Sequence, residues 1–70
     1  SMMTRELKQT EFRIWREEVG LSSEKAAIWL GKTRRTVRYY DEGNHIPLDI
    51  RILMAAIADG YRPRPWKSDA

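Results

Sequence analysis

The amino-acid sequence predicts a compact all-α domain of four helices, with a fifth as an alternative, and its glycines are the first reason. The four glycines, at positions 20, 31, 43 and 60, all come where a helical pattern of apolar residues ends. A glycine just beyond a helix adopts the left-handed backbone conformation at little cost. Ser22 and Thr33 each precede a helical stretch, where a side-chain oxygen can accept a hydrogen bond from an unpaired backbone N–H. No stretch shows the alternation of a strand.

Length and composition predict one small intracellular domain. Seventy residues without cysteine make a single domain, residues 1–70, whose core receives no help from disulfides. No apolar run approaches the roughly 20 residues needed to cross a bilayer, and no signal peptide is visible, so we expect no membrane contact and a cytoplasmic location. Residues 1–4 are expected to be disordered or left over from cloning, and residues 61–70 to form an extended tail.

The helices are expected at about residues 5–19, 23–30, 34–42 and 47–59, from the spacing of apolar residues and the helix-ending glycines. The fourth begins at a proline, which suits a first helical turn. Residues expected to face the core are Phe12, Trp15 or Arg16, and Val19 in the first helix; Ala26, Ala27 and Leu30 in the second; Val37 and Tyr40 in the third; and Leu48, Ile50, Leu53, Met54, Ile57 and Ala58 in the fourth.

The third helix sorts its residues into an apolar face and a basic face. If Val37 and Tyr40 pack inward, the residues that point outward are Arg34, Arg35, Arg38 and Tyr39. Arginine can donate two parallel hydrogen bonds to guanine, and a helix of this kind fits the major groove of DNA. Together with the preceding helix and the turn at Gly31, it indicates a helix-turn-helix. An ordinary solvated helix face is the alternative interpretation of this cluster of cations. The net charge of +3 by itself favours a polyanionic partner only weakly.

A string of residues around this motif, AxxLGxTxxTVxxYDEGxxxP, resembles the lambda repressor-like, Xre/Cro-type helix-turn-helix family. The residues that carry the resemblance are Ala27, Leu30, Gly31, Thr33, Val37, Tyr40, Asp41 and Gly43, and the likeness covers about residues 12–60. It implies a compact helical domain that binds double-stranded operator DNA, generally as a homodimer on an inverted repeat. It also implies a transcriptional repressor from a prokaryote or a phage.

The resemblance assigns roles to individual residues. The positions that read bases in the family correspond to Arg34, Arg35 and Tyr39, with Arg38 between them. The phosphate contacts expected from the family and from the helix termini are Ser22, Ser23, Lys32, Thr33, Thr36, Asn44 and His45. Family members often pair an arginine of the first helix with the acid after the aromatic residue, which predicts an ion pair between Arg16 and Asp41.

Three residues depart from the family by being apolar where its members are often polar: Ile14, Ile28 and Trp29. Exposed apolar residues of this kind indicate an interface or a covering segment. We expect the tail to fold back over part of this surface through the apolar residues Tyr61, Pro63, Pro65 and Trp66, with a dimer contact through the first and second helices as the alternative. Because the tail replaces a fifth helix, the family's usual dimer surface is in doubt.

Three other interpretations stay open. The run TVRYYDEG is also similar to the MerR signature, although the segment after Pro47 reads as a long helix rather than a β-wing. Anti-CRISPR-associated phage repressors can share both the RYY run and a GYRPxP tail. A protein-interaction module of antitoxin or adaptor type would use Ile14, Ile28 and Trp29 to bind a partner.

Catalytic chemistry is not indicated. His45 is the only histidine and there is no cysteine, so an ordinary zinc site has no ligand set. No phosphate-binding glycine loop or nucleophile motif is present. We expect no enzyme activity, no cofactor, no metal and no small-molecule ligand.

Overall fold

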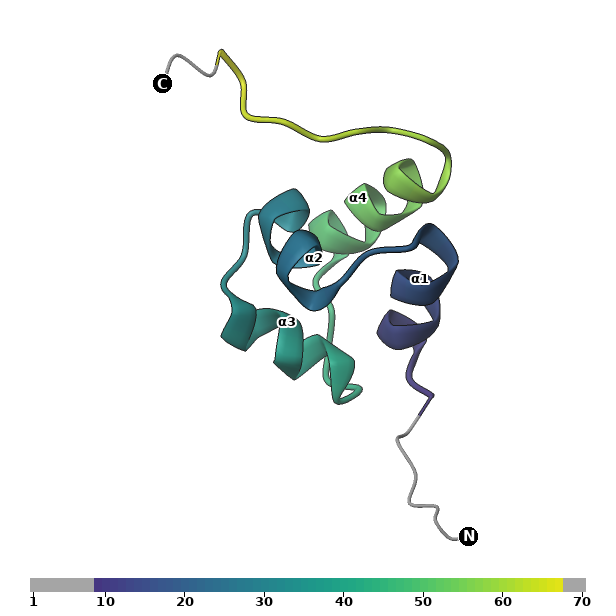
Figure 1. The fold of residues 1–70 in the computed structure, drawn as a ribbon. Helices are drawn as coiled ribbons and strands as arrows, with labels where there is room; N and C mark the ends of the chain where they lie inside the picture. Colours follow the sequence, from purple (N-terminus) through teal and green to yellow (C-terminus); the bar gives the residue numbers. More distant parts are fainter. Residues whose placement is uncertain (1–8, 68–70) are drawn as a thin grey trace, which may run out of the picture.

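A computed structural model describes residues 9–67 of the chain. It contains α1 (Glu11–Val19), α2 (Ser23–Leu30), α3 (Arg34–Asp41) and α4 (Leu48–Ala58). Across these residues there is no strand and no fifth helix, so the all-α fold of four helices is confirmed. α3 lies at one end of the helical body, and the tail leaves α4 at the other (Figure 1). The expectations for residues 1–4, and for a helix over residues 5–8, fall outside the described range.

Three helices begin in the same way. The side-chain oxygens of Thr10, Ser22 and Thr33 accept hydrogen bonds from the backbone N–H three residues further on, at 3.2, 3.1 and 3.1 Å. Two of these caps were predicted, whereas the one at Thr10 was missed. Because its cap is residue 10, α1 begins at Glu11, and the predicted start near residue 5 is wrong at least for residues 9 and 10, which are not helical.

Three other boundaries, the end of α3 and both ends of α4, differ from the prediction by a single residue, and the rest lie where they were predicted. Pro47 has an extended backbone and is the N-cap of α4, so the helix begins at Leu48 rather than at the proline. α3 ends at Asp41, and Glu42 is its C-cap. At the C-terminal ends of α1 and α2, Gly20 and Gly31 have φ of 75° and 67°, as the glycine pattern predicts.

The core is formed by one face from each helix and by the segments between them. Its buried members are Phe12, Trp15, Leu21, Ala26, Ala27, Leu30, Val37, Tyr40, Ile46, Ile50, Met54 and Ile57. Two predicted core positions are wrong: Leu48 is 71% exposed, and Ala58 is also exposed. Both lie away from the α4 stripe of Ile50, Met54 and Ile57, since only one side of this helix meets the body of the fold.

Aromatic side chains join α1 to its neighbours. The Phe12 ring lies 5.3 Å, between centroids, from both the Trp15 ring and the Tyr40 ring of α3. The indole N–H of Trp15 donates a hydrogen bond of 2.9 Å to the carbonyl oxygen of Met54 in α4. α2 packs mainly against α3, and α1 against α4. α3 is therefore held from behind by both α1 and α2.

The tail folds back only in part. Residues 61–65 form neither helix nor strand, residues 66 and 67 form a turn, and residues 68–70 of the predicted tail lie outside the described range. The Arg62 guanidinium lies 5.6 Å from the centre of the Trp29 ring. Trp66, however, is 85% exposed, so the expectation that its ring covers the apolar surface is wrong. The covering contact comes from Arg62, because Trp66 lies beyond the second of two prolines that keep this part of the tail extended.

Candidate nucleic-acid interface

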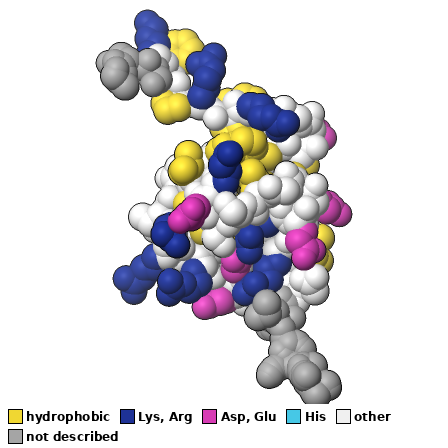
Figure 2. All heavy atoms as spheres, in the orientation of Figure 1, with side chains coloured by type: hydrophobic (Ala, Val, Ile, Leu, Met, Phe, Trp, Pro, Cys, Tyr) yellow, Lys and Arg dark blue, Asp and Glu magenta, His cyan; other side chains and the backbone are white. Residues whose placement is uncertain are grey.

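The outer face of α3 is basic and open to solvent. The side chains of Arg34, Arg35, Arg38 and Tyr39 are all exposed. Figure 2 shows Lys and Arg side chains gathered over the end of the molecule where α3 lies. Between residues 32 and 38 there is no acidic residue to offset these charges. The four residues predicted to contact bases are thus brought together on one accessible surface.

One of these arginines has a carboxylate nearby. Arg34 Nη1 lies 3.4 Å from Glu24 Oε2 of α2, and both side chains are about 70% exposed. An ion pair this exposed contributes between zero and about 1 kcal/mol, because water screens the charges and two long side chains must be ordered. Among the described residues, Arg35 and Arg38 have no carboxylate within ion-pair distance. Within residues 9–67, the guanidinium groups of Arg35 and Arg38 are therefore unpaired, and the exposed pair of Arg34 with Glu24 is weak enough to exchange for another anion.

Polar residues predicted to contact phosphate lie at both ends of α3. At the N-terminal end, Thr33 accepts from the Thr36 backbone N–H and its hydroxyl also donates to Thr36 Oγ1, each at 3.1 Å, and Lys32 is exposed beside them. At the C-terminal end, the Asn44 side-chain amide donates to the Tyr39 carbonyl oxygen at 3.0 Å, next to the exposed His45.

Two further predicted phosphate contacts lie at the start of α2. Ser22 is exposed but its hydroxyl oxygen already caps the helix, and Ser23 is half-buried. The backbone N–H groups of this first turn remain the more suitable donors for an anion.

The inner face of α3 anchors the helix in the core. Val37 is completely buried and Tyr40 nearly so. Burial raises the pKa of the Tyr40 hydroxyl, and the negative charge of Asp49 raises it further. The one charged group on this buried face is the carboxylate of Asp41, which is paired with Arg16.

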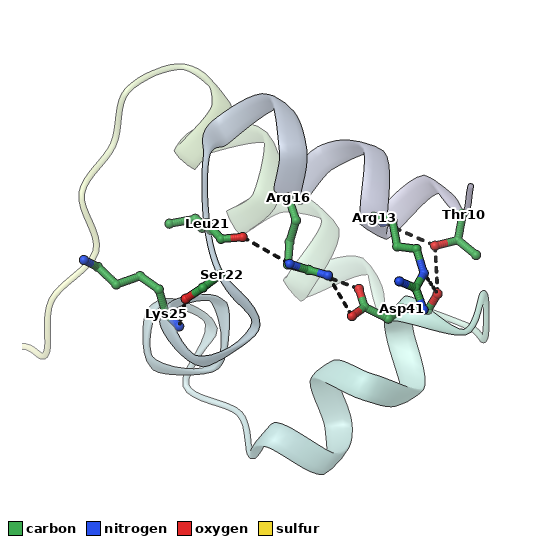
Figure 3. A network of polar contacts seen from close by, with 7 residues as sticks. All are labelled: Thr10, Arg13, Arg16, Leu21, Ser22, Lys25 and Asp41. Atoms are coloured by element: carbon green, nitrogen blue, oxygen red, sulfur yellow. Dashed lines mark hydrogen bonds and ion pairs between the residues drawn. The ribbon is translucent and has the colours of Figure 1, made fainter. Parts of the chain in front are cut away.

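Asp41 connects the end of α3 to α1 through its carboxylate. Arg16 donates from Nε to Asp41 Oδ1 at 3.1 Å and from Nη2 to Asp41 Oδ2 at 3.0 Å, so the predicted ion pair is present and is bidentate (Figure 3). Arg16 Nη1 also donates to the carbonyl oxygen of Leu21 at 3.2 Å. Because Leu21 directly precedes the cap of α2, one guanidinium fixes α1, the start of α2 and the end of α3 relative to each other.

The backbone carbonyl of Asp41 is bound as well, by two residues that were not predicted to have a role. The Thr10 hydroxyl and Arg13 Nε both donate to this oxygen at 2.9 Å (Figure 3). A carbonyl at the C-terminal end of a helix has no partner within the helix, and nearby cations are favoured there. Thr10 had a signal in the sequence, a threonine just before a helical pattern, whereas Arg13 had none because its partner is 28 residues away.

The three apolar residues proposed as an interface have different environments. Ile28 is 75% exposed and Ile14 is 43% exposed, but they lie on different helices. Trp29 is half-buried, packs against the core and carries the Arg62 contact. A shallow groove of about 480 Å³ runs between the end of α2 and the tail, lined by Ile28, Trp29, Leu30, Gly31, Leu53, Tyr61, Pro63, Arg64 and Pro65.

Metal sites and membrane spans have no candidate in the described part of the chain. Over residues 9–67, no three His, Cys, Asp or Glu side chains are grouped so that they could hold a metal ion. None of the helices within the same range has the length and apolar character that a membrane span requires.

The arginine face of α3 is therefore the candidate site with the clearest geometry. Comparisons with known protein families, curated proteins and solved structures gave no significant match to the chain.

Proposed function

We propose that this protein is a sequence-specific, double-stranded DNA-binding regulator of the Xre/Cro type that inserts α3 into the major groove. The observation that carries the proposal is the arrangement of α3 itself. Arg34, Arg35 and Arg38 face solvent, while Val37 and Tyr40 are buried on the opposite side of the same helix. The Asp41 network then fixes the end of the helix relative to α1 and α2.

The dimensions and chemistry of this helix suit the major groove. An α-helix with its side chains is about 10–12 Å across, which matches the roughly 12 Å width of the groove, and the eight residues of α3 provide about two turns to lie in it. Arginines in such a position can each donate two hydrogen bonds to guanine O6 and N7, which distinguishes guanine from the other bases. We expect Tyr39 to add an apolar or hydroxyl contact beside them.

The proposed mode of action is repression by occupying an operator, as in phage and mobile-element repressors. We propose that two copies bind the two halves of an inverted repeat as a homodimer. Sedimentation velocity with and without the selected duplex tests this point. Two protein chains per duplex are expected, and a single chain on a complete site would contradict the dimer.

The experiment that tests DNA recognition starts from a pool of random duplexes. Sequences retained by the wild-type protein are identified, and binding is measured by fluorescence anisotropy for the wild type and for the triple variant Arg34→Ala, Arg35→Ala, Arg38→Ala. The variant is expected to lose both affinity and sequence preference. The control is Arg51→Ala, which removes a positive charge from an exposed position of α4, outside the proposed interface.

Two results would contradict DNA recognition by α3. One is a triple variant that binds the selected duplex as tightly as the wild type does. The other is a wild type that enriches no sequence from the pool.

A protein-interaction module is the second candidate, and the exposure of Ile28 supports it. A 75% exposed isoleucine beside a groove is typical of a surface that another protein covers. The variant Ile28→Gln separates the two functions. It should leave DNA binding unchanged if α3 is the functional surface, and it should abolish partner capture if α2 is.

A further inference from the structure

The C-terminal segment of the described chain is strongly basic. Residues 61–67, which we call the basic tail, have the sequence YRPRPWK and contain Arg62, Arg64 and Lys67 without an acidic residue. The ion pairs found among residues 9–67 involve Arg16, Arg34 and Arg51 only. Within that part of the molecule, the three tail cations therefore have no carboxylate to neutralise them.

The basic tail is held in place at its start and stiffened along its length. The backbone N–H of Tyr61 donates to the Ala56 carbonyl oxygen at 3.0 Å, which fixes where the tail leaves α4. The Arg62 guanidinium lies over the Trp29 ring of α2, 5.6 Å from its centre. Pro63 and Pro65 each lock φ, so the cations between and beyond them lose little conformational entropy when they bind.

The basic tail leaves α4 at the end of the molecule opposite α3, but its middle lies beside the turn that precedes α3. Pro63, Arg64 and Pro65 line the same groove as Leu30 and Gly31, which form the turn of the helix-turn-helix. Gly31 is followed at once by Lys32, Thr33 and the first turn of α3. Figure 1 shows the tail crossing back from the far end of α4 over the α2 end of the molecule. Figure 2 shows Lys and Arg side chains along the tail as well as over α3.

We propose that the basic tail is a second DNA-binding element, which binds the phosphodiester backbone of the duplex beside the segment read by α3. This inference rests on the proposed function and assigns an additional site to it. Exposed arginine and lysine side chains bind phosphate and release counterions, and they do so without regard to sequence. The exposed indole of Trp66 gives the same segment an apolar surface that can pack against the sugars.

The test compares two kinds of duplex and two sets of variants of the full chain. One duplex is limited to the selected site, and the other carries about 10 base pairs, roughly one helical turn, of mixed sequence on each side. Binding is followed by fluorescence anisotropy over a range of salt concentrations. The tail variant is Arg62→Gln, Arg64→Gln, Lys67→Gln, and it is compared with the α3 triple-alanine variant. Arg51→Gln is the control for loss of one cation at another exposed position.

The tail variant is expected to bind the extended duplex with a salt dependence that is shallower by roughly 2.7 in slope, about 0.9 for each phosphate that the tail no longer neutralises. Its ratio of affinities for the selected and scrambled sites should equal that of the wild type, because phosphate contacts do not read sequence. On the short duplex, the difference in this slope between the tail variant and the wild type should be smaller. Arg51→Gln should leave the slope unchanged.

The outcomes distinguish this inference from the proposed function. A tail variant with the wild-type slope on the extended duplex overturns the inference, while DNA recognition by α3 still stands if the α3 variant loses binding. An α3 variant that binds as the wild type does overturns the proposed function. If the α3 variant binds as the wild type does but the tail variant shows a shallower salt dependence, the tail binds polyanions independently of α3.

Discussion

Asp41 connects the end of α3 to α1 in two ways. Its carboxylate binds Arg16, and its backbone carbonyl oxygen accepts hydrogen bonds from Thr10 and Arg13. The carboxylate is 9% exposed and accepts two of the three hydrogen bonds that the Arg16 guanidinium donates, and the Arg16 side chain is itself 18% exposed. Both charges lie largely out of water, so each depends on the other for its compensation. Asp41 therefore fixes the C-terminal end of α3, the proposed recognition helix, against α1.

Asp41→Ala is expected to lower the free energy of unfolding by about 3 kcal/mol, because it leaves the Arg16 guanidinium partly buried without a carboxylate. Urea denaturation followed by circular dichroism measures this value. Glu42→Ala is the matched control, since Glu42 is an exposed acid at the next position, and it should change stability by less than about 0.5 kcal/mol. Equal effects of the two substitutions would show that the pair with Arg16 does not contribute.

The ion pair between Glu11 and Arg51 predicts a dependence of stability on pH. The hydrogen bond from Arg51 is the main reason why the pKa of the Glu11 carboxyl lies below its usual value. A carboxyl with a lowered pKa in the folded state stabilises the protein above the pKa of the unfolded chain, and this contribution is lost as the pH falls through the folded pKa. Since both side chains are exposed, the contribution is small.

The stability difference between the wild type and Arg51→Gln should therefore be present near pH 7 and disappear as the pH falls through the lowered pKa of the Glu11 carboxyl. Thermal denaturation at a series of pH values measures it. A difference that stays constant over this range would mean that Arg51 stabilises the fold through packing rather than through Glu11.

At the scale of the elements, the glycines that follow the helices differ in what surrounds them. Gly31 has φ of 67° and open space around its α-carbon, whereas a Cβ at Gly43, with φ of 94°, would lie 3.2 Å from the Thr10 methyl group. Thr10 caps α1 and donates to the Asp41 carbonyl oxygen, so it cannot move without weakening both of these hydrogen bonds. A side chain at Gly43 therefore disturbs two helices, while one at Gly31 adds only backbone strain.

Gly31→Ala should cost about 1 kcal/mol of stability, the usual penalty of a left-handed residue, and Gly43→Ala should cost more. Gly60→Ala is the control, because Gly60 has φ of 109° and a methyl group added there would have nothing within 4 Å of it. Chemical denaturation of the three variants measures the loss of unfolding free energy that each substitution causes. If Gly43→Ala costs no more than Gly60→Ala, the approach to the Thr10 methyl group is easily relieved.

At the scale of the whole molecule, recognition and stability are expected to be carried by different sides of α3. Arg35 is exposed and has no ion pair among the described residues, so Arg35→Ala should leave the melting temperature of the free protein unchanged. Binding of the selected duplex should be weaker by about 1–3 kcal/mol, with a relaxed preference at one base position.

Differential scanning fluorimetry with and without DNA measures both quantities, because a ligand that binds the folded state raises its melting temperature. For the wild type, this rise should diminish as salt is added. A lower melting temperature of Arg35→Ala without DNA would assign Arg35 a structural role instead.

Much of this architecture is predictable because it depends on local sequence. The caps at Ser22 and Thr33 and the left-handed glycines after α1 and α2 involve residues within one helical turn of each other. The burial of Val37 and Tyr40 follows from helical spacing. Leu48 was placed incorrectly because α4 is apolar nearly all round, so periodicity could not identify which side meets the core.

The sequence by itself determined the helices, their glycine ends and the division of α3 into an apolar and a basic face, because hydrogen bonds and rotations within a single helix decide these features. Only the tertiary structure decided that Thr10 and Arg13 hold the last carbonyl of α3, that Arg62 rather than Trp66 covers Trp29, and that the basic tail lies beside the turn between α2 and α3. Each of these contacts joins residues about 30 positions apart, and such pairings depend on how all four helices pack together.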